Sequence, residues 1–249
     1  MKTMLVLSMG ALLLAGTLSA QTPVPEWQAG VDKMKSLIQT NPAQASEEVG
    51  ELLKGKNKKN VDLVTSVAHV YLDAGKLTEA QEYLAMAKKA DNKDPKVSVL
   101  EGDIALAQKN IGQACQLYEQ AIYFDPNCKE AYLKYAQAYK SASPALAIEK
   151  LEQLKAVDPN CLEADRELAE VYYSSNRFGK AAEMYAKFID TPLATEDDML
   201  KYAFALFLNH DFEKSLQVAQ KGLQKNARHA AFNPVSYTHL RAHETRHDL

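Results

Sequence analysis

Residues 168–188 read LAEVYYSSNRFGKAAEMYAKF, and the spacing of their apolar side chains decides the fold. In the second half of this stretch, Ala181 is followed four residues later by Tyr185, which places both on one face of a helix. In the first half, Ala169 is followed three residues later by Tyr172, which is again a helical spacing. The stretch therefore predicts two consecutive amphipathic helices.

The same pair of helices recurs along the chain with a period of 34 residues, shortened once to 33. The small residues of the second helix are Ala80, Ala114, Ala147, Ala181 and Ser215. The small residues of the first helix are Ala68, Gly102, Ala136, Ala169 and Ala203. Small residues let helix backbones approach closely, while the Leu, Tyr and Phe residues beside them fill the space. We interpret both columns as packing positions without chemistry of their own.

Helix-breaking residues fall where a chain of helix pairs needs them. Gly75 lies between the two helices of one pair, and an Asp-Pro dipeptide follows the second helix of three pairs at 94–95, 125–126 and 158–159. Residues 27–39 and 43–53 predict a first, more degenerate pair. We therefore expect about six helix pairs within residues 21–233.

These residues resemble the tetratricopeptide repeat, from about Trp27 to Ala231. The resemblance implies an all-α, right-handed solenoid of tandem helix-turn-helix units, with a concave groove lined by first helices that holds a peptide or a partner protein. It is closest in kind to the periplasmic repeat proteins of Gram-negative bacteria such as the Bacteroidetes. The unit around Ser143-Pro144 departs from the pattern, because it lacks one residue in its inter-helix turn.

The resemblance also assigns side chains to the groove. These partner-binding candidates are His69, Asp103, Gln137, Arg166, Glu170, Tyr173, Phe204 and Phe207. The last three suggest an aromatic stripe toward the C-terminal end, and buried aromatic rings often dominate binding. The alternative is that Phe204 or Phe207 packs against a further helix pair, which residues 228–232 would open.

Some relatives grip a terminal carboxylate with a lysine and asparagine clamp. The matching positions here are Thr65, His69, Val99 and Asp103. We therefore expect no charged C-terminal tail as the ligand.

Both ends of the chain differ from the repeats. Residues 1–20 combine an early lysine, an apolar run and small residues, as in a secretory signal peptide; the alternative, a membrane anchor, needs roughly 20 apolar residues. No cysteine follows to carry a lipid, so we expect a periplasmic or secreted protein with no other membrane contact. Residues 234–249 resemble a translated sequencing adapter. Their His243-Glu244-Thr245-Arg246-His247 matches a zinc-protease motif, but within such a tail we expect no metal site.

Composition narrows the function further. The 249 residues carry 29 Lys+Arg and 32 Asp+Glu, so a net charge of −3 gives no basic excess for nucleic acid. No catalytic triad or phosphate-binding glycine loop is apparent, so we expect no enzyme, no cofactor and no small-molecule substrate. The four lysines within residues 54–59 predict a solvated loop or, alternatively, a contact with anionic lipid or an acidic partner.

Three cysteines are too few for a disulfide scaffold. Cys128 and Cys161 follow identical Asp-Pro-Asn triplets and occupy the same corner of successive units, which lie on the order of 10 Å apart. A disulfide needs Cα atoms within roughly 7 Å, so we expect free thiols, with Cys115 as a small buried apolar group.

The sequence thus predicts an exported, monomeric binding module for a protein or peptide. One alternative is a structural scaffold subunit of a cell-envelope assembly machine. The other is the repeat portion of an enzyme whose catalytic domain would follow Pro234.

Overall fold

The computed structural model describes residues 24–225 of the chain. Within these residues the chain forms twelve α-helices, one short 3-10 helix and no strand. Their bounds are α1 Gln28–Leu37, α2 Pro42–Leu52, η1 Gly55–Lys59, α3 Val61–Asp73, α4 Leu77–Ala90, α5 Pro95–Ala107, α6 Ile111–Phe124, α7 Lys129–Tyr139, α8 Pro144–Val157, α9 Leu162–Ser174, α10 Phe178–Phe188, α11 Glu196–Leu208 and α12 Phe212–Lys225. None of these helices is long and apolar enough to span a bilayer.

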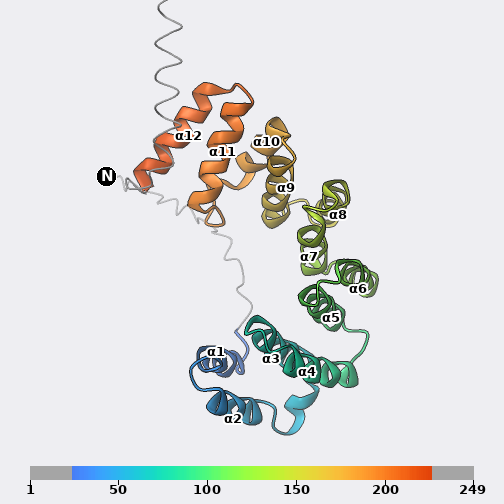
Figure 1. Ribbon diagram of the computed structural model, residues 1–249. Coiled ribbons are helices and arrows are strands. Elements are labelled where there is room, and N and C mark those ends of the chain that lie inside the picture. The colour runs from blue at the N-terminus through green and yellow to red at the C-terminus, as the bar shows by residue number, and fades with distance from the viewer. Residues whose placement is uncertain (1–23, 226–249) are drawn as a thin grey trace, which may run out of the picture.

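Consecutive helices form hairpins that stack into an open arc (Figure 1). The first helices α5, α7 and α9 lie on the inner side of the arc, and their second helices α6, α8 and α10 lie on the outer side. Each pair contacts the pair before and the pair after it, as in a solenoid. The predicted all-α solenoid is confirmed.

The Asp-Pro dipeptides end and begin helices as predicted. Those at 125–126 and 158–159 come directly after the last residues of α6 and α8. Asp94 instead caps the following helix, because its carboxylate accepts a hydrogen bond from the backbone N–H of Lys96 at 2.9 Å. Pro95 is the first residue of α5, where its missing N–H costs no helical hydrogen bond.

The turns inside four helix pairs share a residue in the left-handed backbone region. The φ values are 74° at Gly75, 63° at Lys109, 58° at Asn176 and 64° at His210. The turn between α7 and α8, residues 140–143, has no such residue. The turn is not shortened as predicted: α7 has 11 residues where α3, α5, α9 and α11 have 13, while the turn that follows it is one residue longer than the others.

We expect Lys109→Gly to raise the free energy of unfolding by about 0.5 kcal/mol. The left-handed region costs an L-residue roughly 1–2 kcal/mol, and part of the gain is lost to the greater entropy of glycine in the unfolded chain. Urea denaturation measures the change. Asn176→Gly is the matched control and gains less, because asparagine tolerates this region. A loss of stability in Lys109→Gly contradicts the expectation.

The two columns of small residues are buried, which confirms their role in packing. Their relative exposure is 0% for Ala68, Ala136, Ala169 and Ala203 and for Ala80, Ala114, Ala147, Ala181 and Ser215. Gly102 is the member with the least room, because a Cβ atom there would lie 2.5 Å from Cε1 of Tyr118. The hydroxyl of Ser215 donates to the carbonyl of Ala203 at 2.8 Å, so the last pair joins its two columns through a hydrogen bond.

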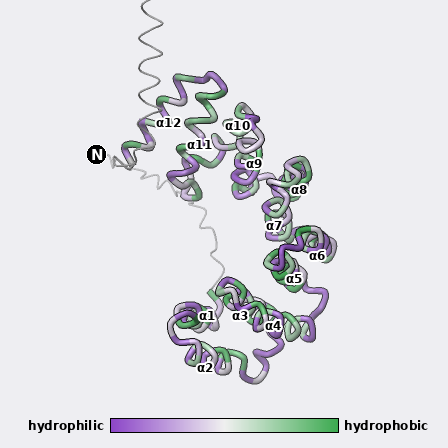
Figure 2. Tube along the Cα trace, in the orientation of Figure 1, coloured by the Kyte–Doolittle hydropathy of each residue, from purple (hydrophilic) through white to green (hydrophobic). Residues whose placement is uncertain are grey.

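The apolar core runs the length of the arc as three successive clusters. One spans α1 to α5, the next α5 to α7, and the third α7 to α12. Apolar residues accordingly recur along every helix and do not gather in one segment (Figure 2). Because each pair is covered on two sides, α5 is buried nearly all round, with eight buried residues among its thirteen.

All three cysteines are free thiols in the structure. Cys128 and Cys161 lie immediately before α7 and α9, at the equivalent corner of successive pairs that the sequence predicts. Cys115 is buried beside Ala114, and burial raises the pKa of its thiol to about 11. The sequence expectation that Cys115 acts as a small apolar group agrees with this environment.

Candidate partner-binding face

The eight side chains predicted to face a groove all lie on first helices of their pairs. They are His69 on α3, Asp103 on α5, Gln137 on α7, Arg166, Glu170 and Tyr173 on α9, and Phe204 and Phe207 on α11. We call the surface formed by these five first helices the inner face. Only Asp103 of the eight is buried, and Gln137 is exposed.

The polar members of the set tie neighbouring first helices together. His69 pairs with Asp103 at 3.1 Å, and the amide of Gln137 donates to Glu167 at 2.7 Å. Their partners lie 34 and 30 residues further along the chain, one repeat away. These side chains therefore hold the stack together as well as lining its inner face.

The third and fifth helix pairs carry the same arrangement, which we call the acid–tyrosine–lysine triad. The two triads are Asp103, Tyr118 and Lys134, and Glu170, Tyr185 and Lys201. In both, the tyrosine hydroxyl donates to the carboxylate at 2.7 Å and the lysine ammonium donates to it at 3.0 Å. The tyrosine comes from the second helix of the same pair and the lysine from the next first helix. Corresponding members are 67 residues, or two repeats, apart.

The triads keep their charge pattern at neutral pH. Burial raises the pKa of Tyr118 and Tyr185, and the neighbouring carboxylates raise it further. Burial alone would raise the pKa of Asp103, but the hydrogen bond with His69, the charge of Lys134 and the hydrogen bond from Tyr118 lower it overall. The tyrosines therefore stay protonated donors, and Asp103 stays an ionised acceptor.

The fourth pair breaks this pattern at all three positions. Gln137 stands where the third and fifth pairs have an acid, Leu151 where they have tyrosine, and Glu167 where they have lysine. The hydrogen bond between first helices is kept, but its polarity is reversed, because the amide donates to the carboxylate. From the third to the fifth pair, the inner face therefore changes from a triad to an amide–carboxylate bond and back to a triad.

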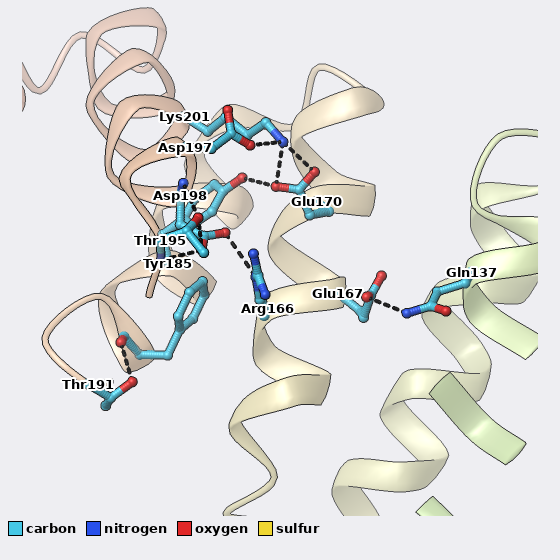
Figure 3. Close-up of polar contacts among 11 residues, drawn as sticks. Gln137, Arg166, Glu167, Glu170, Tyr185, Thr191, Thr195, Asp197, Asp198 and Lys201 are labelled. Atoms are coloured by element: carbon cyan, nitrogen blue, oxygen red, sulfur yellow. Dashed lines mark hydrogen bonds and ion pairs between the residues drawn. The ribbon is translucent and has the colours of Figure 1, made fainter. Parts of the chain in front are cut away.

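Arg166 holds the start of α11. Its Nε donates to Asp198 at 3.0 Å, and the side chain of Asp198 is only 1% exposed. Asp198 also accepts from the backbone N–H of Thr195 at 2.8 Å, while the Thr195 hydroxyl accepts from the N–H of Asp198, which forms a capping box. Figure 3 shows α9 sending Arg166 and Glu170 toward α11 on one side and Glu167 toward Gln137 on the other.

The predicted aromatic side chains are half-buried. Tyr173 meets Phe178 edge to face at 5.8 Å between ring centroids, and Phe204 packs partly against the third core cluster. Phe207 lies 5.5 Å from the ring of Phe212 on α12. Tyr173 and Phe207 thus each pack against a ring of their own helix pair. Whether the aromatic stripe binds a partner stays a prediction.

Sequence reasoning missed four partners of these side chains: Lys134, Glu167, Asp198 and Lys201. The signal that finds them is a spacing of 30 to 32 residues from a first-helix polar side chain. That spacing is one repeat less about one helical turn, so it joins neighbouring first helices along a diagonal.

The sequence profile of the tetratricopeptide repeat matches residues 67–127 and 137–194. These two ranges include α4, α5, α6, α8, α9 and α10 in full and the C-terminal parts of α3 and α7. The chain is a tetratricopeptide repeat protein.

Solved structures of tetratricopeptide repeat proteins share the fold. PilW, described as a widely conserved type IV pilus biogenesis factor, superposes with a TM-score of 0.65 at 17% sequence identity over 84% of this chain and 97% of PilW. PilF of Pseudomonas aeruginosa superposes with a TM-score of 0.62 at 16% sequence identity, over 85% of this chain and 96% of PilF. YrrB, described as having an unusual peptide-binding site, superposes with a TM-score of 0.55 at 14% sequence identity, over 76% of this chain and 97% of YrrB. No curated protein matches the sequence significantly.

The carboxylate clamp of some tetratricopeptide repeat proteins has no counterpart here. At its matching positions, Thr65 and Val99 are buried, and Asp103 holds His69. Within residues 24–225 no group of three His, Cys, Asp or Glu side chains could hold a metal ion. The zinc-protease motif at 243–247 and the signal-like segment at 1–20 lie outside the described residues.

Proposed function

We propose that this chain is an exported interaction module that holds a peptide or a partner protein against its inner face. The observation that carries the proposal is that half-buried aromatic rings, Tyr173 and Phe204, lie on first helices within a tetratricopeptide repeat solenoid. Such folds are typically non-catalytic interaction modules, and we propose the same for this chain. The peptide-binding site named for YrrB supports the assignment by analogy of fold.

The location and assembly state follow the sequence. The signal-like residues 1–20 support a periplasmic or secreted protein, and the separate stacking of each pair on its neighbours supports a monomer. A buried aromatic side chain contributes most to binding where its pocket excludes water. A partner that covers Tyr173 and Phe204 would complete the burial that their own helix pairs begin.

A second candidate is a scaffold subunit of a cell-envelope assembly machine. The likeness to PilW over most of each chain favours it, since PilW is described as a type IV pilus biogenesis factor. In this role the inner face would hold a fixed subunit of the machine. In the first role it would hold an exchangeable peptide.

We expect a photo-cross-linking residue at Gln137 to capture one predominant partner in the native host. Gln137 is an exposed inner-face residue, so a bound partner lies within reach of it. Placing the same residue at Tyr123 is the matched control, because Tyr123 is 83% exposed on the second helix α6. Mass spectrometry of the adducts identifies the protein.

Equal adducts from both positions contradict binding at the inner face. The same holds for an adduct from Tyr123 alone or from neither position. An adduct with a membrane-complex subunit in stable stoichiometry favours the scaffold role, and exchange of the partner by added peptide favours the receptor role.

A further inference from the structure

The C-terminal part of the inner face combines apolar side chains with an acidic surround. Tyr173, Leu200 and Phe204 are only partly buried against the core, and Leu208 at the end of α11 is 44% exposed. Lys201, Glu170 and Asp197 lie close enough to Tyr173 to affect the pKa of its hydroxyl, which burial raises. We call the surface formed by Glu170, Tyr173, Asp197 and Phe204, together with Glu167 on the side of α9 that faces α7, the α9–α11 patch.

Counted by themselves, the two helices of this patch are more acidic than the chain, although lysines of α7, α8 and α10 pair with Glu163 and Asp165. Helices α9 and α11 carry seven carboxylates against two basic side chains, whereas the whole chain has 32 against 29. Five of the seven lie in first turns, where the helix dipole favours negative charge. Glu167 and Glu170 lie further along α9, so the helix dipole does not account for them.

Arg166 and Lys201, the positively charged side chains of α9 and α11, already pair with carboxylates. Arg166 bonds the buried Asp198 at 3.0 Å, and Lys201 is shared between Glu170 and Asp197, each at 2.8 Å. The partner of Glu167 is the neutral amide of Gln137. Figure 3 shows these carboxylates and their partners. The patch therefore holds carboxylate charge in excess of its cations, and Tyr173 and Phe204 on the same two helices are only partly buried.

We infer that the α9–α11 patch takes a cationic segment of the partner protein, in which lysine or arginine alternates with apolar residues. This inference rests on the proposed binding role of the inner face and specifies the chemistry of what binds there. A lysine or arginine of such a segment pairs with Glu167 and the Glu170–Asp197 carboxylates. Cations also stack favourably on tyrosine and phenylalanine rings, and the apolar residues of the segment cover Tyr173 and Phe204.

An acidic segment does not fit the same surface. It would meet Glu167 and Glu170 across the interface, and juxtaposed like charges oppose binding strongly. A purely apolar segment would leave the excess carboxylate charge of Glu167 without a counter-ion while displacing its water. Charge complementarity therefore selects the cationic class.

The test uses the full chain and two labelled probes. One is a short fluorescein peptide of equal parts lysine and leucine, and the other has glutamate in place of every lysine. Fluorescence anisotropy measures both affinities at about 0.05 M salt, where exposed charges are weakly screened. We expect the lysine–leucine peptide to bind at least about 10-fold more tightly than the glutamate–leucine peptide.

The Glu167→Gln variant localises the interaction. It removes the charge but keeps the shape of the side chain. We expect it to weaken binding of the lysine–leucine peptide by about 3-fold to 10-fold. Glu152→Gln is the matched control, because it makes the same charge change at an exposed residue of the second helix α8. We expect no change in affinity in that control.

Tighter or equal binding of the glutamate–leucine peptide overturns the inference. So does an equal loss of affinity in Glu152→Gln and Glu167→Gln, or the binding of neither peptide. These outcomes leave the proposed function to be judged separately by the Gln137 cross-link. If that cross-linked partner is displaced by the glutamate–leucine peptide alone, the inner face binds partners but not cationic ones.

Discussion

Replacing Phe188 with alanine is expected to lower the free energy of unfolding by about 4 kcal/mol. Phe188 ends α10 with 0% exposure, and its ring lies 5.8 Å from that of Tyr185. It belongs to the third core cluster, which joins α7 to α12. Truncation therefore removes a large apolar surface and leaves a cavity between pairs whose backbones are fixed by the buried alanine columns.

The matched control is Tyr123→Ala. Tyr123 is an aromatic residue of the second helix α6, and it is 83% exposed. We expect it to change stability by less than about 0.5 kcal/mol. Urea denaturation followed by circular dichroism measures both variants. A loss below about 1 kcal/mol in Phe188→Ala contradicts the packing described for the fifth pair.

The arrangement of the core could be read from the sequence because it depends on one-dimensional periodicity. Ala114 and Ala181 predict buried contact positions from spacing alone, and both are fully buried. In a solenoid each pair contacts only its neighbours, so a pattern along the chain translates directly into a pattern in space. The length of α7 could not be predicted from the sequence, because a one-residue deletion can shorten either a helix or a turn.

The polar network of the inner face was predicted only in part. The sequence named Asp103 and Glu170 as facing side chains, but it did not indicate that Lys134 and Lys201 reach back to them. Such diagonal contacts depend on the offset between neighbouring first helices, which the period leaves undetermined. A buried carboxylate, Asp165, was also missed; its partners are Lys155 at 2.8 Å and Lys187 at 3.2 Å, which come from the second helices α8 and α10.

Removing the carboxylate of the first triad with Asp103→Ala is expected to cost about 3 kcal/mol of unfolding free energy. Asp103 accepts hydrogen bonds from Tyr118 and Lys134 and pairs with His69. Tyr118 has 0% exposure, so its hydroxyl would lose its acceptor where water cannot replace it. His69 and Lys134 are partly exposed and regain water, which limits their share of the loss.

Tyr118→Phe separates the contributions. It removes one hydrogen bond of Asp103 and keeps the ring that packs over Gly102, so we expect a loss of about 1 kcal/mol. Urea denaturation of both variants at neutral pH gives the comparison. An equal loss in Tyr118→Phe and Asp103→Ala would mean that His69 and Lys134 contribute nothing to the stack.

The dependence of stability on acid pH tests whether the negative charge of Asp103 causes this stabilisation. Its pKa is lowered in the folded state from an ordinary value of 3.8, so the unfolded chain binds more protons near that pH. The stabilisation is therefore fully present above about pH 5 and disappears as the pH falls through the lowered pKa. The stability difference between the wild type and Asp103→Asn should shrink steadily over that range. If instead the difference stays constant down to about pH 2, the carboxylate acts in the triad through its shape and not through its charge.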